Sequence, residues 1–89
     1  MMYSIKVHDQ LIKKYQEVYE LHGLGFELSL QRAISKGKFY VSLTENSDLV
    51  SYILKKYSVE FLERFFIYMG YKFDAKINMN GVREYTISW

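Results

Sequence analysis

The chain has 89 residues, of which 49% are hydrophobic and 25% are charged, and its formal net charge is +2. These values are typical of one folded domain over residues 1–89 and exclude a disordered chain. The near balance of charges does not favour nucleic-acid binding, which usually needs a strong basic excess. Because the chain has no cysteine, disulfides, thiol catalysis and thiolate metal sites are excluded.

The expected cellular compartment follows from the absence of a signal-peptide or membrane-span pattern in the sequence. Residues 1–7 lack the long apolar core of a signal peptide. No run approaches the roughly 18 apolar residues of a membrane span. We therefore expect a cytoplasmic protein without membrane contact.

The first two elements follow from a change in apolar spacing. Tyr3, Ile5 and Val7 alternate with polar residues, which predicts a strand over residues 2–7. Asp9 can then cap a helix to about residue 21, closed by Gly23. The apolar stripe of that helix is Leu11, Ile12, Tyr15, Val18 and Tyr19.

Two further alternating runs, at residues 24–34 and 39–43, predict a β hairpin with its turn at Lys36 and Gly37. If Ile34 faces Phe39, then residues 30 and 43 also face each other and the apolar faces coincide. A short helix over residues 30–36 is the competing interpretation.

Two helices are expected next, at residues 47–57 and 58–69. Asn46 or Ser47 can cap the first, and Ser58 can cap the second, which Gly70 ends. One continuous bent helix over 47–69 is the alternative.

The last segment predicts a hairpin of strands 71–77 and 85–89. A two-residue turn at Asn80 and Gly81 would pair Phe73 with Ser88 and separate the apolar faces. A three-residue loop over 79–81, with Gly81 in the left-handed conformation, corrects this. The pairs are then Phe73 with Ile87, Tyr71 with Trp89, and Lys76 with Glu84.

The resulting order is β-α-β-β-α-α-β-β. It predicts an α+β domain with a single, mostly antiparallel sheet and helices on one face. The outline is ferredoxin-like, with an extra C-terminal strand.

Residues that carry chemistry are sparse. His8 and His22 have no second ligand at a metal-binding spacing. The carboxylate pairs Glu17/Glu20 and Glu60/Glu63 each share a helical face, and we interpret both as solvated surface. No phosphate-binding glycine motif or nucleophile elbow is present. We expect no catalytic residue, no metal and no cofactor.

Nucleic-acid binding is the alternative function. Residues 36–43 match the third-strand consensus of RNA-recognition motifs in part, but Lys38 replaces the first stacking aromatic, so we treat the match as chance. The predicted open sheet face carries one aromatic residue and mixed charge, which is poor for stacking bases. The residues for such a site would be Lys6, Lys38, Tyr40 and Lys72.

The helical side offers a different surface. Projected at 100° per residue, Ile67 points away from the buried stripe of its helix, Tyr68 lies at the margin, and Tyr52 lies off the stripe of the preceding helix. Large apolar residues gathered in one exposed patch mark an interaction surface, although packing between the two helices would bury them instead.

We therefore expect a non-enzymatic protein-binding module. It would be a small regulator or inhibitor acting on a larger protein, of the kind found in phages and mobile elements. A homodimer through the same patch is a second use of it. RNA or single-stranded DNA binding through the open sheet face is the alternative, and a small nuclease ranks last because no general acid or base is evident.

Overall fold

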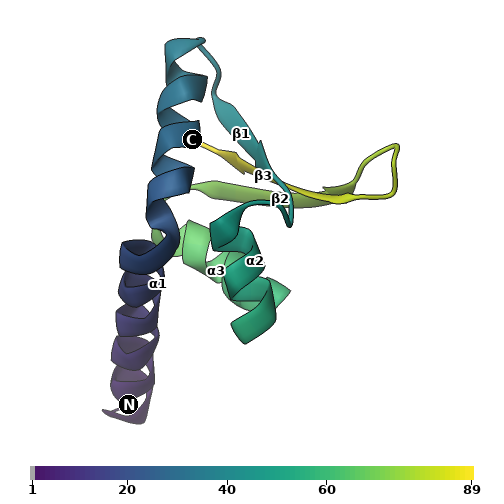
Figure 1. Cartoon of the computed structure of the whole chain (residues 1–89). Coiled ribbons are helices and arrows are strands. Elements are labelled where there is room, and N and C mark those ends of the chain that lie inside the picture. The colour runs from purple at the N-terminus through teal and green to yellow at the C-terminus, as the bar shows by residue number, and fades with distance from the viewer. Residues whose placement is uncertain (1) are drawn as a thin grey trace.

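The computed structural model describes the backbone of residues 2–89 and the side chains of residues 9–89. Along residues 2–89 the elements are α1 (Met2–Ser35), β1 (Tyr40–Leu43), α2 (Asp48–Lys56), α3 (Val59–Tyr68), β2 (Lys72–Ile77) and β3 (Arg83–Ser88). In Figure 1, α1 runs along one side, α2 and α3 lie beside its middle, and the β2–β3 hairpin projects away from the body. The chain is α+β, as predicted. Residues 2–89 form three strands rather than the five expected, and the predicted element order and ferredoxin-like outline are not found.

Helix α1 is the main correction to the sequence-based expectation. The predicted strand at 2–7, the helix end at Gly23 and the predicted strand at 24–34 all lie within this one helix of 34 residues. Phe26 and Ala33 are buried and Leu30 packs on the core, so the inward face continues at helical spacing past the glycines. Backbone groups of residues 2–7 find partners inside the helix, where a strand would need a neighbour.

Gly23 stays in the helix because of what it packs against. A Cβ at Gly23 would lie 3.0 Å from the ring of Tyr19. The Tyr19 hydroxyl donates a hydrogen bond to the Glu27 carboxylate two turns on. Burial, together with this bond, raises the pKa of Tyr19 to about 12. Because Gly23 has no side chain, the Tyr19 ring can lie against the helix backbone at this position.

The predicted hairpin of residues 24–34 with 39–43 is wrong, because its first strand is helical. The competing helix over 30–36 lies almost wholly within α1, which ends at Ser35. The second strand is real: β1 pairs antiparallel with β3, with Val41 opposite Ile87. β3 thereby becomes the central strand of a sheet ordered β1-β3-β2.

The two short helices are separate, as the first interpretation predicted. Ser58 precedes α3, and its hydroxyl oxygen accepts a hydrogen bond of 3.1 Å from the backbone N–H of Phe61. Ser47 precedes α2 but makes no side-chain capping bond. Asp48 lies in the first turn of α2, and Lys55 and Lys56 lie in its last turn, which suits the helix dipole.

The C-terminal hairpin has the predicted register. Phe73 lies opposite Ile87 and Lys76 lies opposite Glu84. The Asn78 N–H donates to the Val82 carbonyl at 2.9 Å, which leaves residues 79–81 as a three-residue loop. Gly81 has φ 78°, the left-handed conformation that the loop requires.

The core lies between the helices and one face of the sheet. Phe66 of α3 is fully buried, with its ring centroid 5.2 Å from that of Phe26 and 6.2 Å from that of Phe73. Aromatic rings bury a large area per residue, which suits a chain of this length. The other large, fully buried side chains are Val18, Leu49, Val50, Ile53, Leu62, Phe65, Tyr85 and Ile87. Over the residues described, no helix combines the length and apolarity needed to cross a membrane.

Candidate functional site

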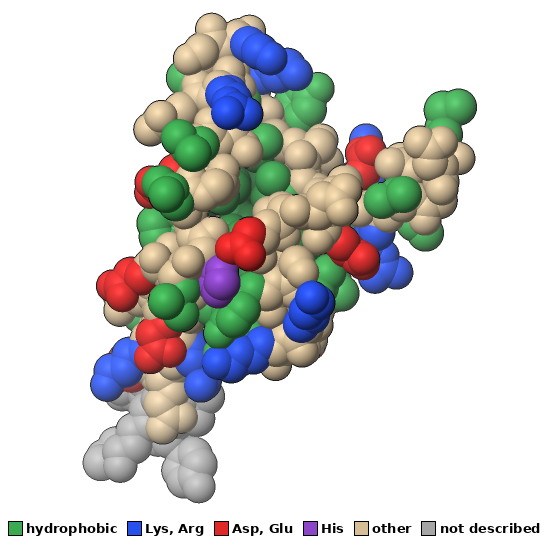
Figure 2. All heavy atoms as spheres, viewed as in Figure 1, with side chains coloured by type: hydrophobic (Ala, Val, Ile, Leu, Met, Phe, Trp, Pro, Cys, Tyr) green, Lys and Arg blue, Asp and Glu red, His purple; other side chains and the backbone are tan. Residues whose placement is uncertain are grey.

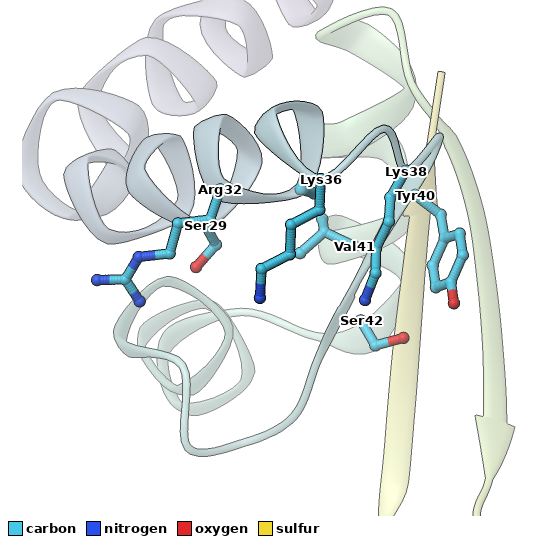
Figure 3. Close-up of a pocket in the computed structure, with 8 residues that line it drawn as sticks. Ser29, Arg32, Lys36, Lys38, Tyr40, Val41 and Ser42 are labelled. Carbon is cyan, nitrogen blue, oxygen red and sulfur yellow. The ribbon is translucent and has the colours of Figure 1, made fainter.

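The end of α1 and strand β1 enclose a pocket rich in basic side chains. It has a volume of about 340 Å³. Figure 3 shows Lys36 and Lys38 extending side by side, while Arg32 points further back along α1. We call it the basic pocket, and its lining is Ser29, Arg32, Ala33, Lys36, Lys38, Tyr40, Val41 and Ser42.

The chain reversal after α1 brings these cations together. Gly37 adopts φ 73°, and the Lys38 N–H donates to the Ala33 carbonyl at 2.9 Å, which closes the helix and turns the chain back toward β1. Arg32 and Lys36 are four residues apart and therefore share a helix face. The lining provides three cations and no carboxylate among the described residues, so its chemistry suits an anion.

Three of the four residues predicted for nucleic-acid binding lie near one another. Lys38 Nζ is 5.9 Å from the centroid of the Tyr40 ring. Tyr40 and Lys72 both lie opposite Ser88 of β3, so they share one face of the sheet. The side chain of the fourth residue, Lys6, lies outside the described residues. The sequence interpretation missed Arg32 and Lys36 because they were assigned to a strand and a turn.

Two exposed aromatic residues lie beside this pocket. Phe39 is 73% exposed and Trp89 is 39% exposed. The Trp89 N–H donates to the Phe39 carbonyl at 3.2 Å, so the two residues are neighbours at the end of the sheet. Each directly adjoins a residue of the Tyr40–Ser88 pair, so both lie on the sheet face opposite Tyr40 and neither lines the pocket.

A second hollow lies between α1 and α3. Its volume is about 420 Å³, and the buried ring of Tyr15 forms part of it. Ile67 is 56% exposed and Tyr68 is 42% exposed, and the rings of Tyr15 and Tyr68 are 5.2 Å apart. We call it the α1–α3 groove, and its lining is Leu11, Tyr15, Glu63, Arg64, Ile67 and Tyr68.

The third residue predicted for the protein-binding patch has other neighbours. Tyr52 is half-buried, and its ring stacks on that of His22 with centroids 4.0 Å apart. The Lys56 amine lies 5.5 Å from the Tyr52 ring, and its interaction with Tyr52 raises the pKa of Lys56. Ile67 and Tyr68 thus line one groove, while Tyr52 packs at the α1–α2 contact.

His22 and Glu60 each contact one side chain that can carry the opposite charge. His22 Nδ1 lies 2.6 Å from Asp48 Oδ2, and Arg64 Nε donates to Glu60 at 3.3 Å. Among residues 9–89, no group of three or more His, Asp or Glu side chains is gathered to hold a metal ion. The side chain of His8 is not among those described.

The β2–β3 hairpin carries apolar side chains that the sequence interpretation did not single out. Ile77 is 66% exposed, Val82 is 44% exposed and Met79 is fully exposed. Figure 1 shows why, because this end of the hairpin extends past the helices that cover the rest of the sheet. The alternation in β2 therefore predicted the correct sheet face for Ile77 but not its exposure.

Comparison with known proteins gives no relative. No protein-family model matches the chain, and neither a curated protein nor a solved structure matches it.

Proposed function

We propose that this chain is a non-enzymatic protein-binding module that docks on a larger protein through the α1–α3 groove. The observation that carries the proposal is the pair Ile67 and Tyr68, both exposed at the rim of a hollow that includes the buried Tyr15. A hollow lined mainly by apolar side chains, with Glu63 and Arg64 beside them, accepts an apolar anchor from a partner, and tyrosine is enriched at the centres of such interfaces.

The charges on α3 favour protein over duplex DNA. Two short helices joined by a tight turn have the order of a helix-turn-helix unit, in which the second helix enters the DNA major groove. Here the exposed side of that second helix carries Glu60 and Glu63, and the cation Arg64 is paired with Glu60. Phosphates would meet like charge, whereas a protein surface with mixed charge would not.

The class that we propose is a small cytoplasmic regulator or inhibitor, of the kind that phages and mobile elements encode. This class rests on size and on the lack of an evident catalytic set in the sequence, which is analogy at the level of protein classes. Tyr52 does not line the groove, and one face of its ring already stacks on His22. We therefore propose that it contacts the partner only at the edge of the interface.

The test is quantitative affinity capture from nuclease-treated lysate of the source cell. We expect one protein that the wild-type chain captures and that Ile67→Asp or Tyr68→Ala loses. Val59→Asp is the matched control, because Val59 is also exposed on α3 but does not line the groove. Tyr52→Ala should have the smaller effect. Capture that survives Ile67→Asp, or no enriched protein at all, would contradict the proposal.

The basic pocket supports a second candidate, binding of RNA or single-stranded DNA. Lys36 and Lys38 would contact phosphates, and Tyr40 would stack on a base. We expect Lys36→Glu with Lys38→Glu to abolish binding of a labelled oligonucleotide in fluorescence anisotropy, and affinity to fall steeply with salt. Lys55→Glu with Lys56→Glu is the charge-matched control, because both residues lie on α2. Absence of binding by the wild-type chain at low salt would end this candidate.

A further inference from the structure

Helix α1 has a second apolar stripe that faces solvent. Leu21 is 69% exposed, Leu24 is 71% exposed and Leu28 is 48% exposed. At 100° per residue they fall within an arc of about 60°, on the side of α1 opposite Phe26 and Leu30. Figure 2 shows hydrophobic side chains at the surface along α1. We call Leu21, Leu24 and Leu28 the outer stripe.

A glycine opens a hole in this stripe. Leu21, Leu24, Gly25 and Leu28 stand at positions i, i+3, i+4 and i+7, the four positions that surround a knob from a facing helix. Gly25 is exposed, and a Cβ placed on it would meet nothing within 4 Å. Glycine in a helix interior destabilises the helix relative to alanine. Gly23 packs against the ring of Tyr19, whereas Gly25 has no such neighbour among the described residues.

We propose that a second copy of this chain packs antiparallel against the outer stripe, with Leu24 of each copy inserted in the hole of the other. The hole is centred between residues 24 and 25, so residues equally far from that point on either side face each other. Leu21 then faces Leu28 of the second copy, and Leu28 faces its Leu21. A twofold rotation therefore exchanges the two copies and leaves their contacts unchanged, as a symmetric dimer requires.

The charges beside the stripe favour this orientation. In the antiparallel pair, Glu17 faces Arg32 of the second copy and Arg32 faces its Glu17. In a parallel pair, each of these residues would face its own like charge. Lys13 and Lys36 fall near the ends, where crossed helices diverge and salt screens their repulsion.

The dimer would leave the α1–α3 groove open, whereas Arg32 of the basic pocket would face Glu17 of the second copy. The outer stripe lies opposite the buried side of α1, so the two sheets would point away from each other. The α1–α3 groove uses Leu11 and Tyr15, which lie toward the inner side of α1. The inference therefore does not rest on the proposed partner, and either can fail without the other.

The test is the oligomeric state of the full chain by sedimentation velocity. We expect the wild-type chain to sediment as a dimer, at twice its 10.7 kDa mass. Leu24→Asp should raise the dissociation constant at least tenfold and leave the circular dichroism spectrum unchanged. Ile34→Asp is the matched control, since Ile34 is 56% exposed on α1 but outside the stripe. A wild-type monomer at every concentration, or a dimer that tolerates Leu24→Asp, would overturn the proposal.

The orientation has its own test. Glu17→Arg and Arg32→Glu should each weaken the dimer, and the double variant should restore it. The chain lacks cysteine, so an equimolar mixture of Leu21→Cys and Leu28→Cys chains can be oxidised. The mixed disulfide should dominate, because like cysteines in the antiparallel pair lie about 10 Å apart along the axis. Disulfides between like chains as the main product would overturn the antiparallel arrangement.

Discussion

His22 of α1 and Asp48 at the first turn of α2 meet at 2.6 Å between Nδ1 and Oδ2, and they are 26 residues apart in the chain. The His22 ring also stacks on Tyr52 of α2. This pair therefore ties the middle of the long helix to the start of the second one.

The first prediction is a measurable coupling between these two residues. Asp48 is 75% exposed, so the contact should contribute about 0.5 kcal/mol, in the range of surface pairs. His22→Ala, Asp48→Ala and the double variant form a double-mutant cycle on the free energy of unfolding in urea. Glu45→Ala is a control, since Glu45 is exposed and outside the contact. Additive effects in the cycle would show that the contact does not form.

A second prediction contrasts neighbours on α3. Phe66 is fully buried and Ile67 is 56% exposed. Phe66→Ala should lower the free energy of unfolding by about 3–5 kcal/mol, a large share of the stability of a small domain. Ile67→Ala should change it by less than about 0.5 kcal/mol. Urea unfolding followed by circular dichroism measures both, and equal effects would contradict the placement of α3.

The third prediction concerns the two serines before α2 and α3. Ser58→Ala should cost about 1 kcal/mol of unfolding free energy, because it removes the hydrogen bond to the Phe61 N–H. Ser47→Ala should cost less, since Ser47 makes no side-chain capping bond. Thermal unfolding of both variants measures the difference. A larger loss for Ser47→Ala would reverse the assignment of the caps.

The fourth prediction is a dependence on alkaline pH. In the folded chain the pKa of Tyr19 is about 12, above its ordinary value of 10.0. The unfolded chain loses this proton first, so the stabilisation from Tyr19 is complete below pH 10 and declines as pH rises toward 12.

Ultraviolet absorbance tests this directly, because ionised tyrosine absorbs differently from neutral tyrosine. Tyr19→Phe should remove one late step from the titration of the nine tyrosines. It should also make unfolding less sensitive to pH above 10 than in the wild-type chain. Tyr40→Phe, on an exposed ring, is the control. An unchanged late step in Tyr19→Phe would assign that step to another tyrosine.

The outer stripe explains why residues 24–34 of α1 were predicted as a strand. Residues two apart on a helix lie about 200° apart, almost on opposite sides. Leu24 and Leu28 face solvent while Phe26 and Leu30 face the core. A helix with apolar residues on both sides thus reproduces the alternation of a strand, and Gly23, interpreted as the end of the preceding helix, strengthened the error. The signal that distinguishes the two is the spacing of Tyr15, Val18 and Phe26, which stays helical throughout.

The C-terminal hairpin was predictable because its constraints are local. The apolar faces of β2 and β3 agree in one register, and Gly81 supplies the one left-handed residue that this loop needs. By contrast, β1 pairs with β3 across more than forty residues of chain, a partner that no local pattern indicates. The basic pocket was missed for a different reason: its lining lies within residues 29–42, where α1 was predicted as a strand, and Gly37 turns β1 back beside the end of that helix.

The position of β3 in the middle of the sheet has a consequence for synthesis on the ribosome. β1 and β2 each pair with β3. A nascent chain that has not yet exposed residues 83–88 can form helices but cannot complete its sheet. The apolar residues of α1 and α3 that pack against the sheet then remain exposed to solvent. Such exposure favours chaperone binding or association between chains. Folding of this domain should therefore be late and abrupt, and pausing of translation before residue 83 should lower its soluble yield.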